Sequence, residues 1–384
     1  MTHSEISTPA TPTAIHMKLK LALIGPGQIA GHHVCPAADP AAVLFPGGEA
    51  EFVAVMDVDE DRAQAFAKKY GIPRVYTDVD ELLEKEQPHI VSITTPPKWH
   101  AELSIKAMEA GAWVLCEKPL CASLRELDAI REAETRTGNY CSSVFQFRFG
   151  GASRHIKRII EEQVAGKVLV GTCHTTWYRD PAYYAVDWRG TWASEFGGPT
   201  MGHGIHAMDT FLWTMGEWAE VRALSATIDR DIEVEDVSSA SVRFSNGAVG
   251  NILNAILCPQ ENTFIRFDFQ QASAWTEGAV YDLNKDKWRF KTLETMEPAK
   301  AADFVTITDD TRTKQFSQLR ALVADYRAGR RPLVSGPEAR RTIEFITSLY
   351  KSAATGQPVK PGTITEGDPF YEHVGGTLAR VTAM

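Results

Sequence analysis

The stretch KLKLALIGPGQIA, residues 18–30, decides the fold. It opens with an apolar run typical of a β-strand, the run ends at Gly25, and a helical pattern follows Gln28. A strand, a glycine-rich turn and a helix in this order are the setting of a dinucleotide-binding turn. Gly25 permits the tight turn, Gly27 lets the backbone approach a pyrophosphate, and the helix N-terminus offers free N–H groups to the phosphates. The motif alone is also compatible with an ordinary glycine turn.

A carboxylate follows the second strand-like run, residues 51–56. Asp57 at the end of that run can accept hydrogen bonds from both adenosine ribose hydroxyls, and its charge repels a 2′-phosphate. Arg62 is the nearby cation that could oppose this effect. We therefore expect NAD as the cofactor, with NADP less favoured. Residues 36–50 lengthen the usual gap between turn and carboxylate and predict an inserted loop, which could contact substrate or a neighbouring subunit, or do neither.

The second informative motif is Cys116-Glu117-Lys118-Pro119, at the end of an apolar run that begins at Ala112. A lysine at the end of a buried strand is costly to desolvate unless it has a partner. Lys118 is therefore a candidate for chemistry, the alternative being a lysine that reaches the surface. Glu117 could meet the nicotinamide ribose or orient Lys118, the alternative being a surface or helix-capping carboxylate. Together, the turn and this motif indicate a nicotinamide-dependent oxidoreductase.

Composition excludes several functional classes. The 384 residues are 44% hydrophobic and 23% charged, as in a soluble globular protein with room for two domains. The net charge of −9 argues against nucleic acid or an anionic membrane as a partner. No apolar run approaches the roughly 18 residues needed to span a bilayer. The six cysteines lack paired zinc-type spacing, which predicts reduced thiols in the cytoplasm and no metal site.

The pattern of elements divides the chain into a tail and two domains. Residues 1–17, rich in Ser, Thr and Pro, lack a signal-peptide pattern and predict a disordered tail. Residues 18–145 alternate strand-like and helical runs, which predicts an α/β domain with a parallel sheet flanked by helices. Residues 146–384 predict an α+β domain on a largely antiparallel sheet. Its expected strands are 168–177, 221–228, 238–244, 249–257, 264–269 and 279–283, its expected helices are 153–163, 206–215 and 337–354, and a hairpin turn is expected at 245–247.

Four motifs occur in a fixed order along the chain. They are the glycine turn at 25–30, Thr94-Thr95-Pro96-Pro97 with His100, Glu117-Lys118-Pro119, and the stretch from Gly197-Gly198 through His206 to Asp209. As a set they resemble the glucose–fructose oxidoreductase, inositol dehydrogenase and rhizopine-catabolism (Gfo/Idh/MocA) family, over residues 19–354. The resemblance implies an N-terminal Rossmann domain and a C-terminal open sheet used in dimer or tetramer contacts. It also implies oxidation or reduction of sugar-like alcohols, without fixing the substrate.

The resemblance also implies roles for single residues. Lys118 corresponds to the lysine that hydrogen-bonds the reacting hydroxyl or carbonyl. His206 corresponds to the histidine that exchanges the hydroxyl proton near neutral pH, with a satisfied core histidine as the alternative. Many relatives carry Asp or Asn where this chain has Gly202, so His203 is a candidate substitute. The residues expected at the cofactor are Gly25, Gly27, Gln28, Ile29, Asp57, Arg62, Thr95, Pro96, His100 and Glu117.

Substrate contacts are expected from two regions. Residues 177–192 are rich in aromatics and arginine and predict a loop over the pocket, the alternative being packing in the core or a subunit interface. Arg148 matches a position of substrate-facing polar residues but could form a structural ion pair. Asp209 could orient His206 or cap locally. The expected substrate-contacting residues are Gln146, Arg148, Tyr178, Tyr183, Trp188 and Asp209.

These features favour an NAD-dependent oxidoreductase acting on a secondary alcohol or ketone of a sugar, inositol or sugar derivative. Two alternatives stay open: a redox-neutral glycoside-processing enzyme that retains its NAD, and an NAD-binding sensor without catalysis. We expect a homodimer or homotetramer formed through the C-terminal sheet. His32 and His33 are interpreted as ordinary residues of the first helix.

Overall fold

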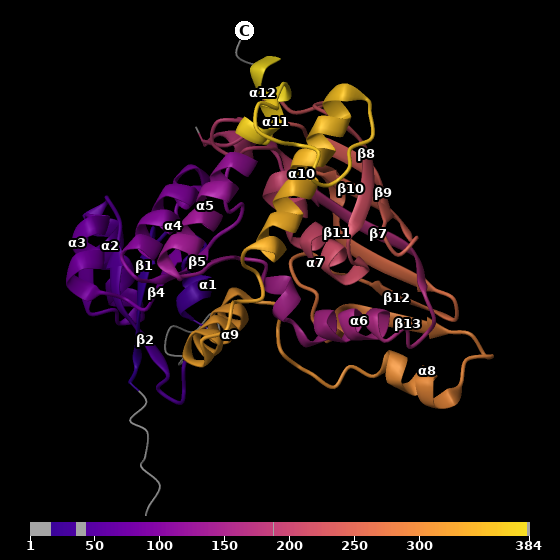
Figure 1. Cartoon of the computed structure of the whole chain (residues 1–384), viewed down its shortest axis with the longest axis horizontal. Helices are drawn as coiled ribbons and strands as arrows, with labels where there is room; N and C mark the ends of the chain where they lie inside the picture. The colour runs from indigo at the N-terminus through magenta and orange to yellow at the C-terminus, as the bar shows by residue number, and fades with distance from the viewer. Residues whose placement is uncertain (1–16, 36–43, 187, 382–384) are drawn as a thin grey trace, which may run out of the picture.

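The computed structural model describes residues 17–35, 44–186 and 188–381. The expected tail, apart from Met17, and residues 36–43 of the expected loop lie outside the described residues. Figure 1 shows two sheets side by side, the N-terminal one in indigo and purple and the C-terminal one in magenta to orange. Helix α10 (Pro337–Thr355) packs against strand β8 (Trp218–Ala226) of the C-terminal sheet and against helix α5 (Leu124–Thr137) of the N-terminal half. In the described part of the chain, every helix is too short or too polar to cross a bilayer.

The N-terminal sheet has six parallel strands in the order β3-β2-β1-β4-β5-β6. They are β1 (Leu19–Ile24), β2 (Ala50–Met56), β3 (Arg74–Tyr76), β4 (Ile90–Ile93), β5 (Trp113–Cys116) and β6 (Cys141–Ser143). The helices between them are α1 (Gly31–Val34), α2 (Glu60–Tyr70), α3 (Val79–Glu86), α4 (His100–Glu109) and α5 (Leu124–Thr137). The strand order changes direction between β1 and β4, and such sheets bind ligands outside the carboxyl ends of the strands at that point. The predicted Rossmann fold is confirmed.

Local capping sets where two of these helices begin. Asp59 accepts a hydrogen bond from the backbone N–H of Arg62 at the start of α2. Ser123 accepts one from the backbone N–H of Glu126 at the start of α5. Both helices end at a glycine in the left-handed conformation. The lengths of these elements therefore follow from nearby sequence.

The C-terminal sheet has seven strands in the order β13-β12-β11-β7-β10-β9-β8. They are β7 (Val168–Tyr178), β8 (Trp218–Ala226), β9 (Val237–Phe244), β10 (Val249–Ala255), β11 (Leu257–Phe269), β12 (Ala272–Thr276) and β13 (Trp288–Thr292). The pair β7–β10 is parallel and the other pairs are antiparallel. This confirms the expected, largely antiparallel sheet. The predicted hairpin turn joins β9 to β10, and Gly247 in it has φ +90°.

One face of this sheet is covered and the other is not. Helices α7 (Ile205–Met215) and α10 pack on the covered face, with α6 (Gly151–Glu161) beside α7 (Figure 1). Along β9, Val242 and Phe244 are buried while Ser241 and Arg243 are exposed. The alternation is the signature of a sheet packed on one side. The second face is therefore open to solvent in the described chain.

One predicted strand is wrong. Residues 279–283 do not join the sheet, whose edge is formed by β12 and β13. Gly278, with φ +66°, turns the chain away after β12. The Thr263 backbone N–H then donates to the Ala279 carbonyl at 2.7 Å, and the Thr263 hydroxyl donates to the Val280 carbonyl at 2.5 Å. These two bonds hold the segment beside β11 without a strand ladder.

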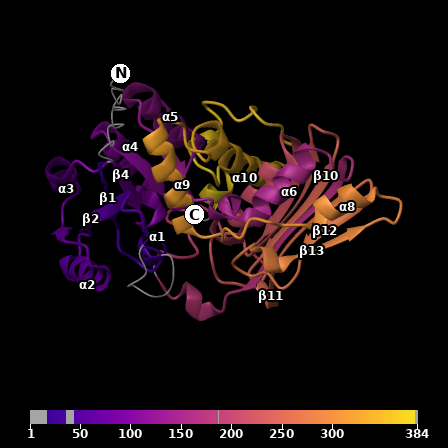
Figure 2. The ribbon, with the colours of Figure 1, turned by 90° about the horizontal axis from the view of Figure 1, so that it is seen from below.

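Four described helices arise where the sequence patterns predicted none: α8 (Pro298–Val305), α9 (Gln315–Ala328) and the short α11 (Pro369–Glu372) and α12 (Leu378–Val381). Helix α9 packs against the N-terminal sheet, and Figure 2 shows it beside α1. Its buried Leu319 and Leu322 share a core cluster with Leu21 and Leu115 of that sheet. Helix α9 thus packs on the N-terminal sheet although it follows the strands of the C-terminal sheet in the sequence.

A buried ion pair fixes α7, the helix that carries His206. Arg148, in η2 (Gln146–Phe149), donates to both carboxylate oxygens of Asp209 on α7, at 2.7 and 2.6 Å. It also donates to Glu338 on α10 at 2.6 Å. Arg148 and Asp209 are both 0% exposed. The structure therefore corrects the expected substrate contact of these two residues, because each charge is matched by the other inside the core.

We predict that Arg148→Ala destabilises the protein by about 3–5 kcal/mol, because it leaves the Asp209 carboxylate buried without its partner. Urea unfolding followed by circular dichroism measures the change. The matched control is Arg136→Ala, which removes an exposed pair with Glu109 at 2.6 Å and should change stability by less than about 1 kcal/mol. Equal losses in the two variants would contradict the role given to the buried pair.

Candidate active site

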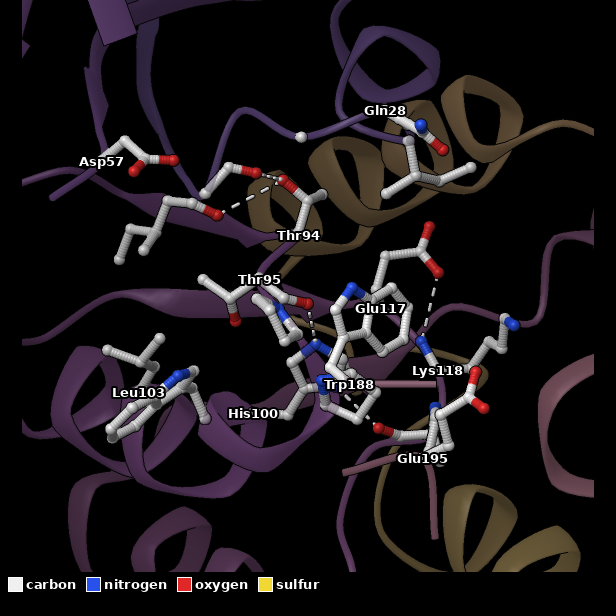
Figure 3. A pocket seen from close by; sticks show the side chains of 18 of the residues that line it. Gln28, Asp57, Thr94, Thr95, His100, Leu103, Glu117, Lys118, Trp188 and Glu195 are labelled. Carbon is white, nitrogen blue, oxygen red and sulfur yellow. Dashed lines mark hydrogen bonds between the residues drawn. The ribbon is translucent and has the colours of Figure 1, made fainter. Parts of the chain in front are cut away.

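A cavity of about 960 Å³ lies outside the carboxyl ends of the N-terminal strands. All the residues expected at the cofactor line it: Gly25, Gly27, Gln28, Ile29, Asp57, Arg62, Thr95, Pro96, His100 and Glu117. Figure 3 shows Asp57 on one side of the cavity and Lys118 with Glu195 on the other. This crevice is the place where such sheets bind dinucleotides.

The glycine turn leaves room for a pyrophosphate. Gly25 has φ +82°, and an added Cβ there would lie 2.6–2.9 Å from atoms of Thr95, so a side chain would be strained. At Gly27 an added Cβ would have no neighbour closer than 4.0 Å, so the backbone faces open space. The Thr94 hydroxyl donates to the Gly25 carbonyl at 2.6 Å and holds the turn against β4. The turn therefore fits a dinucleotide.

Asp57 stands at the end of β2 with 7% of its surface exposed. Its carboxylate accepts the Asp59 backbone N–H at 2.9 Å, and Nη1 of Arg62 lies 3.3 Å from both of its oxygens. Arg62 also donates to the Asp59 carboxylate at 3.0 Å. Two carboxylates share this one guanidinium, so the local charge is negative. A ribose hydroxyl suits this end of the cavity better than a 2′-phosphate does.

His100 links two turns in the cavity wall. Its Nδ1 lies 2.7 Å from the Pro119 carbonyl oxygen, and its Nε2 lies 2.8 Å from the Thr95 carbonyl oxygen (Figure 3). Burial lowers the pKa of His100, although both backbone contacts oppose the shift. The imidazole thus ties the turn after β4 to the Glu-Lys-Pro motif.

His33 lies beside Glu117, although the sequence suggested an ordinary helix residue. The ring is fully buried, with Nε2 3.0 Å from Glu117 Oε1 and Nδ1 2.6 Å from Ser92 Oγ. The other Glu117 oxygen accepts the Lys118 backbone N–H at 3.2 Å. Burial alone would raise the pKa of Glu117, but the hydrogen bond and charge of His33 lower it to about 2. The residue just after the glycine turn therefore orients the carboxylate next to Lys118.

Lys118 connects the two domains at the cavity. Its Nζ donates to the Gly202 carbonyl at 2.7 Å, from the π-helical turn η4 (Thr200–Gly204) that precedes α7. Burial lowers the pKa of Lys118, although Glu117 and Glu195 oppose the shift. An added Cβ at Gly202 would meet no atom within 4 Å. The position where the family resemblance implies Asp or Asn is therefore open space beside the ammonium.

His206, in the first turn of α7, is only 3% exposed. Its Nε2 lies 3.2 Å from the Tyr281 hydroxyl, and its Nδ1 has no hydrogen-bond partner among the described residues. Burial, followed by the charge of Lys118, lowers the pKa of His206 to about 3. The structure corrects the expected titration near neutrality, because the ring stays neutral there. Tyr281 was missed, since a tyrosine in a predicted strand carries no signal of function.

His203 has a different set of neighbours. Its Nε2 lies 3.2 Å from Nε of Arg179 and 3.5 Å from the Tyr183 hydroxyl. Arg179 can only donate, so Nε2 of His203 is an acceptor and the neutral ring carries its proton on Nδ1. Burial lowers the pKa of His203 well below its usual value, and the charges of Arg179 and Lys118 lower it further. His203 therefore offers a hydrogen-bond donor and not a base.

The segment between β7 and η4 lines the cavity end near Lys118, through Tyr183, Val186, Trp188, Arg189 and Glu195. The Arg189 guanidinium lies 3.8 Å from the Tyr183 ring centroid and 4.4 Å from the Trp188 ring centroid. Tyr183 and Trp188 are therefore brought to the site as expected. Tyr178 and Gln146 are not among the lining residues. Arg189, from the expected arginine-rich loop, also lines the cavity, and Glu195 lines it although it was absent from the expected set.

The two halves of the chain match two domains of one family. Residues 19–145 match the oxidoreductase family with an NAD-binding Rossmann fold. Residues 153–275 match the GFO/IDH/MocA C-terminal domain. The chain belongs to the Gfo/Idh/MocA oxidoreductase family. Its N-terminal domain is an NAD-binding domain, which confirms both the family and the cofactor predicted from sequence.

Relatives of this Gfo/Idh/MocA chain align over most of its length. It is 27% identical to the D-glucoside 3-dehydrogenase of Escherichia coli K12, covering 89% of this chain and 97% of that one. It is 24% identical to the myo-inositol 2-dehydrogenase of Thermotoga maritima, covering 89% and 98%. The WlbA dehydrogenase of Chromobacterium violaceum, solved with NADH and UDP-GlcNAcA, has a TM-score of 0.77 at 26% identity, covering 94% and 100%. Levoglucosan dehydrogenase with NADH has a TM-score of 0.77 at 22% identity, covering 90% and 100%, and shows the shared fold.

We predict that the protein binds NAD at least about tenfold more tightly than NADP, because Asp57 repels the 2′-phosphate. Calorimetry with each cofactor measures the ratio. Asp57→Ser should reduce this ratio, whereas Asp61→Asn removes an exposed neighbouring charge outside the cavity lining and should leave the preference for NAD in place. Tighter binding of NADP to the wild-type protein would show that Asp57 does not select the cofactor.

Proposed function

We propose that this chain transfers hydride between NAD and a secondary alcohol or ketone of a sugar, inositol or sugar derivative. One arrangement carries the proposal: Lys118 and Tyr281 line the cavity, and His206 is hydrogen-bonded to the Tyr281 hydroxyl. Alcohol oxidation needs a group that holds the reacting oxygen and a group that accepts its proton, because the hydroxyl proton must leave as the hydride leaves. The names of the relatives, which include a D-glucoside and a myo-inositol dehydrogenase, support the same class of substrate.

Lys118 positions the reacting oxygen in this proposal. An ammonium has three N–H donors, and the Gly202 carbonyl takes one of them at 2.7 Å. The remaining donors can hold the substrate oxygen and stabilise negative charge on it during oxidation. Bound NAD supplies the hydride acceptor or donor.

His206 accepts the substrate hydroxyl proton in this proposal. Since its pKa is lowered to about 3, the imidazole is neutral over the physiological range and has a free site for the hydroxyl proton. His203 lies close by but presents a donor, because Arg179 occupies its Nε2. His203 is not a lining residue and its Nδ1 is buried, so we assign it to holding Arg179 and Tyr183 beside the cavity.

The aromatic segment supplies the sugar contacts. Tyr183 and Trp188 line the cavity and offer flat faces to the C–H surfaces of a ring, while Arg189 and Glu195 can bond hydroxyl groups. Burial raises the pKa of Glu195, although the Gly190 N–H and Arg189 oppose the shift. A polar, ring-shaped substrate fits this combination of faces and charges.

We predict that the protein reduces NAD with at least one of myo-inositol, levoglucosan and methyl β-D-glucopyranoside, followed by NADH absorbance. Lys118→Ala and His206→Asn should each lower kcat by about 100- to 10,000-fold with the affinity for NAD preserved. His203→Asn keeps a donor and should lose less. Exposed Lys167→Ala is the matched control and should retain wild-type turnover.

The pH profile gives a second measurement of the same proposal. The neutral form of His206 is the active base in oxidation, so kcat/KM should hold through neutrality and fall only as the pH drops toward about 3. Accumulation of NADH would exclude the redox-neutral alternative, and turnover of any panel compound would exclude the sensor. Absence of reaction with the whole panel, in both directions, would count against the proposed function.

We also propose that the open face of the C-terminal sheet joins copies of this chain. One cross-strand row over β8, β9, β10, β7 and β11 consists of Leu224, Ser239, Leu253, His174 and Phe264. Leu224 is 75% exposed in the single chain, and covering such a row removes apolar surface from water. Light scattering should show a dimer or tetramer, and Leu224→Glu with Phe264→Glu should dissociate it. A monomeric wild-type protein would overturn this assignment.

A further inference from the structure

Tyr281 occupies the cavity wall where His206 would be expected. Tyr281 lines the cavity together with Lys118 and Gly202. His206 is 3% exposed and is not one of the lining residues. A substrate in the cavity can therefore contact Tyr281, whereas the imidazole lies behind the lining residues.

Two aromatic rings, those of Tyr281 and Phe147, pack against the His206 imidazole. The Tyr281 ring lies edge-on to it, with centroids 5.4 Å apart, and the Phe147 ring lies 5.6 Å away. His206 Nε2 lies 3.2 Å from Tyr281 Oη, and His206 Nδ1 has no hydrogen-bond partner. Among the described residues, the imidazole is therefore hydrogen-bonded to Tyr281 alone. A proton that reaches His206 from the cavity thus has one hydrogen-bonded route, through the phenol.

The phenol is held firmly enough for this task. Its segment is bonded to Thr263 through the carbonyls of residues 279 and 280, and the Leu283 N–H donates to the Thr313 hydroxyl at 3.1 Å. Trp177 donates to the Thr263 hydroxyl at 3.1 Å, and its ring lies 5.5 Å from that of Tyr281. Anchors on both sides of Tyr281 fix its direction, as a proton-transferring group requires.

We propose that Tyr281 is a catalytic residue that relays the substrate hydroxyl proton to His206. The relay rests on the proposed function. In oxidation, the carbinol C–H bond breaks and its hydride goes to the nicotinamide of NAD. The substrate O–H bond breaks, its proton bonds to Tyr281 Oη, and the phenolic proton moves to His206 Nε2.

These transfers balance. The substrate loses two electrons as a hydride and one proton, and it gains a C=O bond; the imidazole becomes an imidazolium, and reduction runs the same path backward. Burial raises the pKa of Tyr281 above its usual value. The two proton movements are therefore coupled, and a free phenolate does not accumulate.

The test begins with Tyr281→Phe, which removes the hydroxyl and keeps the ring. With the panel compound that the wild-type protein oxidises fastest, kcat should fall at least about 100-fold while KM and the affinity for NAD change little. The matched control is Tyr326→Phe, in α9 and away from the cavity, which should keep wild-type kcat. Unchanged kcat in Tyr281→Phe, or a raised KM with normal kcat, would overturn the relay.

The double variant Tyr281→Phe with His206→Asn separates a relay from two independent contacts. Residues that act as one unit are not additive, so the double variant should lose no more than the worse single variant. Losses that multiply would overturn the relay, since they would show that each group acts on the substrate separately.

Nitrogen-15 NMR of the histidines in the NAD-bound protein tests the hydrogen bond without turnover. The relay requires His206 Nε2 to be unprotonated and hydrogen-bonded in the wild type, with the Nε2 resonance shifted in Tyr281→Phe. A proton on Nε2 in the wild type would overturn the relay, because the imidazole could not then accept the phenolic proton. If none of the panel compounds is oxidised, the proposed function fails and the relay with it, whereas a proton on Nε2 in a protein that oxidises a panel compound overturns the relay alone.

Discussion

The hydrogen bond from Lys118 to the Gly202 carbonyl joins the two halves of the site. Lys118 follows the last buried residues of β5 in the N-terminal sheet, and Gly202 lies in the turn that leads into α7 over the C-terminal sheet. Neither half contains both the cofactor residues and His206. The ion pair between Arg148 and Asp209 keeps α7 in the position that this bond requires, because it ties that helix to η2 inside the core.

Burial decides the protonation states around this bond. Desolvation disfavours a charged imidazole, and the nearby ammonium of Lys118 disfavours it further, so His206 and His203 are both kept neutral. Glu117 is equally buried but stays ionised, since His33 hydrogen-bonds its carboxylate. The buried site can therefore hold a neutral proton acceptor, His206, close to a charged hydrogen-bond donor, Lys118.

The open space at Gly202 and the phenol of Tyr281 shape the end of the cavity near Lys118. Four residues before His206, Gly202 has no side chain, and its backbone carbonyl accepts from Lys118. The imidazole behind it is hydrogen-bonded to Tyr281, from the segment held beside β11.

The sequence by itself determined the Rossmann fold and the cofactor end of the cavity. Gly25, Asp57 and Glu117 each follow a strand, and parallel strands bring their carboxyl ends to one edge, so their proximity follows from local pattern. Only the tertiary structure decided which charged side chains pair with each other inside the core and which face the cavity. Arg148 meets Asp209, His33 meets Glu117, and Tyr281 meets His206 across long stretches of chain. No periodicity records such contacts, because they depend on how the two sheets and their helices pack together.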